Sequence, residues 1–144
     1  MMITRPEYLH MYSIIGAAME VFNQLGHGME EPIYQEALEI ELTLRSIPFE
    51  REKLLHTYYK GKQMEKTYQA DFYSNGIMIE LKSHSRIISE HRAQLFNYMR
   101  ITKTTKGLLI NFGERNLHTE RYLYDTQTDD FILLNEQNLH ELVL

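Results

Sequence analysis

Apolar residues recur at three- and four-residue steps near the start of the chain, which is the spacing of an amphipathic helix. A first helix is predicted from Glu7 to Leu25, and Gly26-His27-Gly28 ends it. Its apolar stripe consists of large side chains that repeat along one face: Leu9, Tyr12, Ile15, Met19, Phe22 and Leu25.

A second helix is predicted from Glu30 or Glu31 to Arg45. Pro32 fits its first turn, where a proline loses no hydrogen bond. The residues at helical spacing form one stripe of Tyr34, Leu38 and Leu42. Glu31 then lies at the N-terminal end of this helix, where a carboxylate also complements the helix dipole.

The pattern becomes that of strands in the middle of the chain. Strands are predicted over Ile47–Tyr59, Met64–Tyr73 and Ile77–Ser83, separated by the turns Lys60-Gly61-Lys62 and Asn75-Gly76. Such short turns join antiparallel neighbours. We therefore expect a three-stranded meander.

A further helix and strand follow. We expect Ser89 to cap a helix that reaches about Arg100. The run GLLINF, Gly107–Phe112, is continuously apolar, as in a strand covered on both faces, and we expect it to add to the sheet by a parallel crossover. Weaker patterns predict strands over His118–Tyr124 and Phe131–Leu134 and a last helical turn.

The order αα-βββ-α-β predicts an α/β fold with a mixed central sheet flanked by helices. A length of 144 residues with 43% hydrophobic content suits a single domain, 1–144. The chain has no long apolar run and no signal-peptide pattern at its start, so we expect a soluble, cytoplasmic protein without membrane contact.

Composition narrows the chemistry. The chain has no cysteine, so a metal would be held by oxygen or imidazole, which favours a hard ion. The seven histidines show no ligand spacing such as H-x-x-x-H. A net charge of -5 argues mildly against a protein that coats nucleic acid. It leaves room for an enzyme whose acidic site is neutralised by a metal.

The Asn75-Gly76 turn predicts that two acids meet. If these are the central residues of a two-residue turn, Asp71 lies opposite Glu80, with Cβ atoms about 4.5 to 5.5 Å apart. Lys82 projects from the same face. Like charges in this position are unfavourable unless a positive charge lies between them. The pattern predicts a divalent cation site, and the alternative is a solvated face with a lysine-carboxylate pair.

The chain also resembles a known family. Residues 28–34, Gly-Met-Glu-Glu-Pro-Ile-Tyr, are similar to the G-x-x-E-x-x-Y signature of the GxxExxY proteins, in the PD-(D/E)XK nuclease superfamily. The resemblance covers roughly residues 8 to 125 and continues, in the family's order, through Ala70-Asp71-Phe72, Ile79-Glu80-Leu81-Lys82, Ala93-Gln94-Leu95-Phe96-Asn97-Tyr98 and Leu108-Leu109-Ile110-Asn111-Phe112-Gly113.

This resemblance implies a restriction-endonuclease-like core and a set of roles. Mg²⁺ or Mn²⁺ would be held by Asp71, Glu80, the backbone carbonyl of Leu81 and Glu31. The catalytic residues would be Lys82, which orients or activates water, with Glu31 and Gln94 in support. The candidate substrate contacts are His91, Tyr98 and Tyr34. Because Glu30 is a second acid beside Glu31, the resemblance leaves open which of the two faces the metal.

The predicted function is that of a Mg²⁺- or Mn²⁺-dependent nuclease that cleaves DNA, with RNA as the second choice, by a metal-activated water. One alternative is a catalytically silent module that keeps the fold and binds a protein or nucleic acid. Another is a hydrolase of a different phosphate ester. Gln94, Tyr98 and Tyr34 have a simpler alternative as residues at the edge of the core. The oligomeric state, including a homo-oligomer, stays open.

Overall fold

The computed structural model describes residues 1–144 and has the predicted αα-βββ-α-β order. None of its helices is long and apolar enough to cross a membrane. The helices are α1 (Arg5–Leu25), α2 (Glu31–Leu44), α3 (Ser89–Thr102) and α4 (Leu139–Leu142). The strands are β1 (Glu50–Tyr59), β2 (Lys62–Ser74), β3 (Ile77–Lys82), β4 (Lys106–Asn111), β5 (His118–Asp125) and β6 (Asp130–Leu133).

The six strands form one sheet in sequence order, β1-β2-β3-β4-β5-β6. Only β3 and β4 are parallel, and α3 crosses between them, while the other pairs are antiparallel. The run Gly107–Phe112 is buried along its whole length, as expected of a strand covered on both faces. The predicted α/β fold with a mixed sheet flanked by helices is confirmed.

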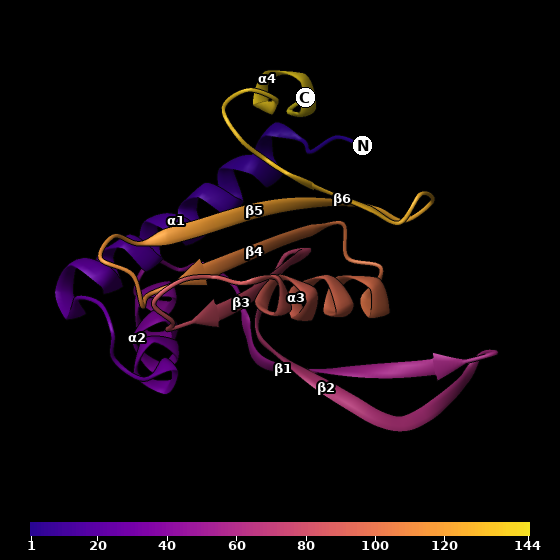
Figure 1. Cartoon of the computed structure of the whole chain (residues 1–144), viewed down its shortest axis with the longest axis horizontal. Helices are drawn as coiled ribbons and strands as arrows, with labels where there is room; N and C mark the ends of the chain where they lie inside the picture. The colour runs from indigo at the N-terminus through magenta and orange to yellow at the C-terminus, as the bar shows by residue number, and fades with distance from the viewer.

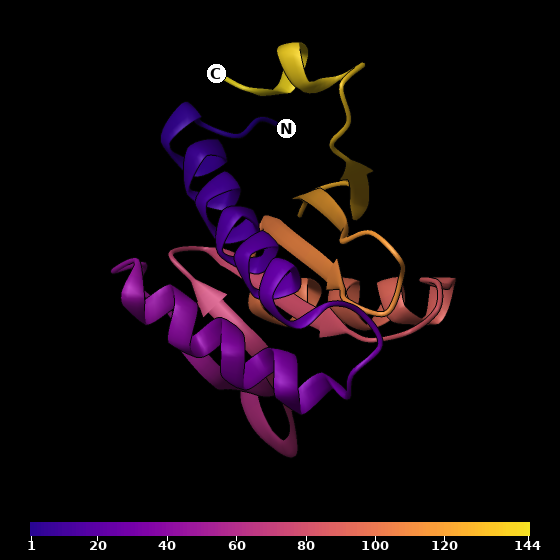
Figure 2. The same ribbon diagram turned by 90° about the vertical axis from the view of Figure 1, so that its left-hand side faces the viewer.

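The helices form a layer on each face of the sheet. Figure 2 shows α1 and α2 in front of the sheet and α3 behind it. On the α1–α2 side the larger core contains Leu38, Ile79 and Ile110. On the α3 side a smaller core contains Met78, Leu95 and Leu109. Alternate residues of β3 and β4 therefore serve opposite layers.

Two local expectations are corrected by the structure. Half of the predicted stripe of α1 points away from the core, because Leu9, Tyr12 and Met19 are more than half exposed. The other half, Ile15, Phe22 and Leu25, packs partly buried against the core. The buried residues of α1 lie on the neighbouring face, and the alanines among them let the helix approach the sheet closely. These buried residues are Met11, Ile14, Ala17, Ala18 and Val21. In α3 the cap residue is Ile88, and not Ser89, because the ring Nδ1 of His91 accepts the Ile88 N–H at 3.1 Å.

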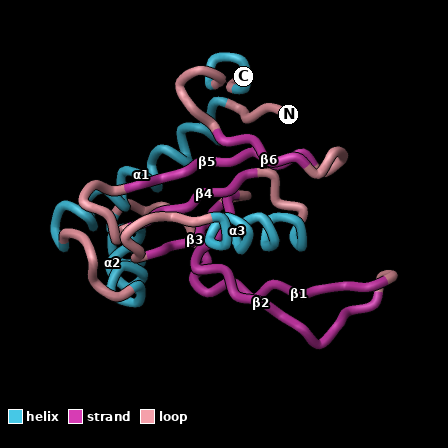
Figure 3. Tube along the Cα trace, in the orientation of Figure 1, coloured by secondary structure: helices cyan, strands magenta, loops and turns pink.

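Strand β2 leaves the sheet at Asp71. It pairs with β3 only over Phe72–Ser74, and beyond that β1 and β2 continue as a two-stranded arm (Figures 1 and 3). Ala70 packs in the core on the α3 side, whereas Phe72 packs on the α1–α2 side. Residues two apart in a regular strand share a face, so β2 turns over at Asp71. Glu52, opposite in β1, has a φ of 53°.

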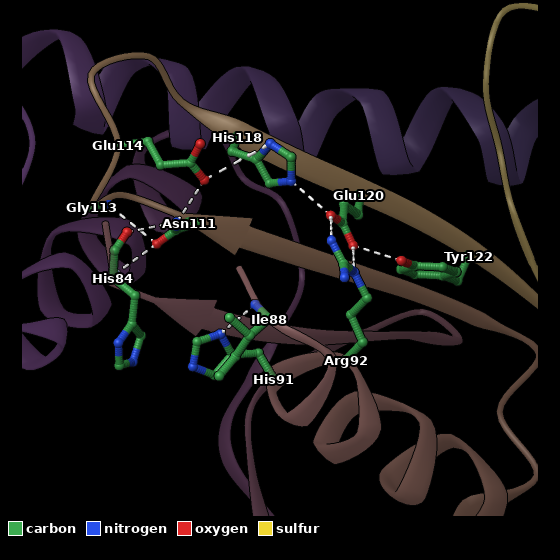
Figure 4. Close-up of polar contacts among 10 residues, drawn as sticks. All are labelled: His84, Ile88, His91, Arg92, Asn111, Gly113, Glu114, His118, Glu120 and Tyr122. Carbon is green, nitrogen blue, oxygen red and sulfur yellow. Dashed lines mark hydrogen bonds and ion pairs between the residues drawn. The ribbon is translucent and has the colours of Figure 1, made fainter. Parts of the chain in front are cut away.

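A polar network joins α3 to β5 (Figure 4). Arg92 donates two hydrogen bonds to the buried carboxylate of Glu120, at 2.7 and 2.8 Å. Tyr122 and His118 contact the same carboxylate at 2.6 and 2.7 Å. Burial raises the pKa of Glu120, but these hydrogen bonds outweigh it and lower the pKa to about 2.

This network predicts a loss of stability in acid. Because the folded pKa of Glu120 is depressed from 4.5 to about 2, its contribution is present above pH 4.5 and disappears as the pH falls to about 2. Glu120→Gln should lower the free energy of unfolding by about 2 kcal/mol at neutral pH and flatten this acid dependence. Urea denaturation across the acid range measures both effects, with the exposed Glu65→Gln as the control. Equal stability of the Glu120→Gln and Glu65→Gln variants would contradict the prediction.

Candidate active site

The predicted hairpin register is confirmed. Ser74 pairs with Ile77, and the following two pairs continue this register to Phe72 and Ile79. Asn75 and Gly76 have φ values of 44° and 87°, and a turn with positive φ at both central residues is the kind that asparagine-glycine favours. The register therefore carries Asp71 and Glu80 to the next position, where the two strands begin to separate.

Asp71 and Glu80 meet through reciprocal hydrogen bonds instead of a backbone pair. The Asp71 N–H donates to Glu80 Oε1 at 2.9 Å, and the Leu81 N–H donates to Asp71 Oδ2 at 2.8 Å. Each carboxyl group thus takes an amide that the separating strands leave without a strand partner. The two carboxyl groups are also close enough for each to influence the pKa of the other.

The separation of β2 from β3 opens a cleft of about 530 Å³ beside the start of α2. Seven residues line the cleft, and only one of them is hydrophobic. They are Glu30, Glu31, Pro32, Gln35, Asp71, Leu81 and Ser83. Asp71 reaches this cleft, whereas Glu80 is 3% exposed behind it. The cleft therefore brings acids from a strand and from a helix terminus to one polar space.

The backbone carbonyl of Leu81 points toward the same side. Phe112 N–H donates to the Lys82 carbonyl at 2.8 Å, so the Lys82 carbonyl points to the strand-β4 side. Successive carbonyls of a strand point in opposite directions. The Leu81 carbonyl therefore points toward the β2 side, as does the Leu81 N–H that binds Asp71.

The surroundings of Asp71 and Glu80 disfavour the ionised form of both carboxyl groups. Burial raises the pKa of Asp71, and the charge of Glu31 adds to this effect, while the Leu81 N–H and Lys82 oppose it. Burial, together with the charge of Asp71, raises the pKa of Glu80 well above its ordinary range. Of the two acids, Glu80 is therefore the one whose pKa its surroundings raise more strongly.

Lys82 lies on the α3 side and is fixed by a relay of side chains. Its Nζ donates to Gln94 Oε1 at 2.5 Å, and Gln94 Nε2 donates to the hydroxyl of Tyr98 at 3.0 Å. An ammonium group can only donate, so the contact fixes which end of the Gln94 amide faces Lys82. The ring of Tyr98 packs on Tyr68, with ring centres 5.6 Å apart. The ammonium is therefore positioned by α3.

Glu30 and Glu31 both line the cleft, from the cap and the first turn of α2. The side chain of Glu31 lies near a histidine, with Glu31 Oε2 3.7 Å from His84 Nε2. Its charge is felt at Asp71, but the structure does not gather Glu31 with Asp71 and Glu80 into one cluster of metal-binding groups.

Tyr34 does not reach the cleft, which corrects its assignment as a substrate contact. The side chain is fully buried, and its ring stacks on Phe112 with centres 4.3 Å apart. Its hydroxyl donates to the Gly26 carbonyl at 2.7 Å and accepts the Met29 N–H at 3.1 Å. Tyr34 therefore fixes the turn that places Glu31.

His84 and His91 form a pair beside Glu31, and the sequence analysis did not single out His84. The rings of His84 and His91 lie 4.3 Å apart, centre to centre (Figure 4). The backbone of His84 is clamped by the buried Asn111, whose side chain accepts the His84 N–H at 3.0 Å and donates to its carbonyl at 2.9 Å. Burial and the nearby charges of His84 and Lys82 lower the pKa of His91.

The residues that determine the position of His84 are Asn111 and Gly113, which both contact its backbone. A Cβ at Gly113 would stand 2.3 Å from the His84 backbone, so only glycine allows this approach. Nothing near His84 in the sequence shows that contact, because the two segments are distant along the chain.

The residues present fit a hard divalent cation. Asp71 and Glu80 each have one oxygen bound to a backbone amide, which leaves each acid a second oxygen, and the Leu81 carbonyl points to the side of β2. Mg²⁺ needs only one or two carboxylates together with water and substrate oxygens. No three His, Asp or Glu side chains cluster closely enough to hold a metal by themselves. This donor set suits an ion shared with a substrate.

Comparisons with known proteins identify the superfamily and the fold. The family model of the PD-(D/E)XK nuclease superfamily matches residues 9–123, and the chain belongs to that superfamily. The crystal structure of SSO0001 is similar, with a TM-score of 0.53 and 23% sequence identity. The similarity covers 68% of this chain and 53% of that one, so this chain spans about half the length of SSO0001 and the likeness shows the fold. No curated protein matches the chain.

The carboxyl pair predicts a stability that falls with rising pH. Because the folded pKa of Glu80 is raised, its effect on stability is lost as the pH rises from the ordinary value of 4.5 through the folded pKa. With a chelator present, the free energy of unfolding should fall as the pH rises above the ordinary pKa of 4.5. Glu80→Gln should remove most of this slope, and chemical denaturation measures it. The exposed Glu36→Gln is the control, and an unchanged slope in Glu80→Gln would refute the assignment.

Proposed function

We propose that this chain is a metal-dependent phosphodiesterase that cleaves nucleic acid, with DNA ahead of RNA. The observation that carries the proposal is the carboxyl pair of half-buried Asp71 and buried Glu80. Lys82 lies two residues after Glu80 in β3, on the same face, and is held by Gln94. An acidic pair with a fixed ammonium beside it suits a reaction that develops negative charge on a phosphate. Membership of the PD-(D/E)XK nuclease superfamily supports the same reaction class.

Mg²⁺ or Mn²⁺ would be held by Asp71, Glu80 and the Leu81 carbonyl, and when bound it would lower the pKa of water and neutralise phosphate charge. Glu31 would complete the acidic side of the cleft from α2. The segment from Gly28 to Tyr34 supports a finer assignment to the GxxExxY family. In that assignment Tyr34 acts through the turn that it fixes.

Lys82 would orient the attacking water and stabilise the charge that develops on the phosphate. Gln94 holds the Lys82 ammonium at 2.5 Å, so the lysine does not have to lose freedom when substrate binds. Tyr98 fixes the other end of the Gln94 amide. This arrangement makes Gln94 and Tyr98 positioning residues, and Lys82 the residue that acts on the reacting atoms.

His91 would contact a phosphate at the entrance of the cleft. Its Nδ1 accepts the Ile88 N–H, which leaves Nε2 as the nitrogen that can meet a substrate. His91 stands three residues before Gln94, so both lie on neighbouring positions of one helix face. A phosphate that reaches Lys82 therefore has a second polar contact within reach on α3.

The test is cleavage of a panel of labelled single- and double-stranded DNA and RNA with Mg²⁺ or Mn²⁺. Lys82→Ala should lower kcat by about 10²- to 10³-fold, because it removes charge at the transition state. Gln94→Ala should lower kcat by about tenfold, because the lysine stays but is less well held. Lys82→Ala should keep metal binding, whereas Asp71→Ala should lose metal binding and turnover together.

The control is His10→Ala, which removes a polar side chain bound to Ser74 on the other side of the sheet. Its kcat should match the wild type. Cleavage no faster than that of Glu80→Ala on every substrate would overturn the nuclease proposal. The fold would then serve binding without catalysis, and Lys82 would act as the charge partner of the two acids.

A further inference from the structure

A second groove lies between the β1–β2 arm and the C-terminal half of α3. Its volume is about 550 Å³, and it is lined by the arm residues Tyr58, Met64, Lys66 and Tyr68 together with Arg100 and Lys103 from the end of α3 and just beyond it. Figures 1 and 3 show the arm leaving the sheet below α3. No part of the candidate active site lines this groove.

The groove has the opposite charge to the chain as a whole. Acidic residues outnumber lysine and arginine by 20 to 15 in the sequence, yet three of the nine lining residues are cationic and none is acidic. Arg100 is already committed to Asp129 at 2.8 Å. Lys66 and Lys103 make no ion pair within 4.0 Å, although the charge of Lys103 does act on Asp129, the partner of Arg100.

The groove also presents an aromatic surface. Tyr58 is 58% exposed, although burying such a ring is favourable. Tyr68 lies deeper, with the Lys66 ammonium 4.8 Å from its ring centre and Tyr98 against it. An exposed tyrosine beside unpaired lysines is the combination that holds unstacked bases and their phosphates.

The groove is physically connected to Lys82. The contacts run from Lys82 to Gln94, from Gln94 to Tyr98 and from Tyr98 to Tyr68, which lines the groove. Gln94 and Ile101 are separated by seven residues of α3, or about 10 Å along the helix. That span equals about three stacked nucleotides at about 3.4 Å each. A strand cleaved at Lys82 can therefore continue into the groove.

We propose that this groove binds a single-stranded stretch of nucleic acid that flanks the scissile phosphate. Lys66 and Lys103 contact its phosphates, and Tyr58 stacks on one of its bases. The inference rests on the proposed function for the position of the scissile phosphate. A single strand is required, because the bases of a duplex are already stacked on one another and do not offer a face to a tyrosine.

The test measures binding without cleavage. Fluorescence anisotropy is recorded for a labelled oligothymidylate of about 15 nucleotides, in the Lys82→Ala background with Mg²⁺. Adding Lys66→Gln with Lys103→Asn should weaken binding about tenfold and reduce the slope of log affinity against log salt by about 1.4. Asparagine is chosen because residue 103 has a φ of 58°, which asparagine tolerates. Tyr58→Ser should weaken binding about tenfold, and Tyr58→Phe should restore it.

The matched control is Arg5→Ala with Arg45→Ala, which removes two charges from the helices on the opposite face of the sheet. Its affinity and salt slope should equal those of the background. Circular dichroism confirms that each variant is folded. Equal affinity in the groove variants and the control would overturn the inference, as would equal binding of a blunt duplex.

Two further outcomes separate the proposals. If the wild type cleaves nothing but the groove variants still lose strand binding, the groove stands and the nuclease proposal fails. If the wild type cleaves but the groove variants bind and cleave like the control, the groove proposal fails alone. A change in sedimentation of the groove variants with unchanged strand binding would assign the groove to a second copy of this chain and overturn the inference.

Discussion

The structure depends on the exchange of hydrogen bonds between Asp71 and Glu80 where β2 separates from β3. Each carboxyl group accepts a backbone amide that the separating strands would otherwise leave unpaired, at 2.9 and 2.8 Å. The arrangement costs free energy, since two acids are brought together and one is almost fully buried. A hard cation between the two carboxyl groups would relieve that cost.

The rest of the fold supplies what this pair needs. Helix α3 holds Lys82 through Gln94, and α2 presents Glu31 across the cleft. The two helices lie on opposite faces of the sheet (Figure 2), and the site forms where β2 separates from β3 between them. The Asn111 side chain holds the backbone of His84 before α3, and the Arg92–Glu120 ion pair joins α3 to β5. The same turn of β2 that opens the cleft also sends the β1–β2 arm outward.

The features of the site that depend on residues close together in the sequence were predictable. The Asn75-Gly76 turn determines the hairpin register within a few residues, and that register brings Asp71 to Glu80. Half of the predicted stripe of α1 is exposed, because two apolar stripes have the same spacing and only packing against the sheet selects between them. His84 was missed because its position depends on Asn111, 27 residues away. Tyr34 was misplaced because its partner Phe112 is far along the chain.

We propose that the carboxyl groups of Asp71 and Glu80 share a divalent cation. Carbon-13 NMR of labelled glutamate side chains, with Glu80→Gln to assign the signal, follows the Glu80 carboxyl group directly as the pH rises. With a chelator the pKa of Glu80 should be well above the usual range, as burial and Asp71 require. Saturating Mg²⁺ should lower that pKa strongly, because binding the ion favours the charged carboxylate. A pKa of Glu80 that does not move when Mg²⁺ or Mn²⁺ is added would contradict the claim.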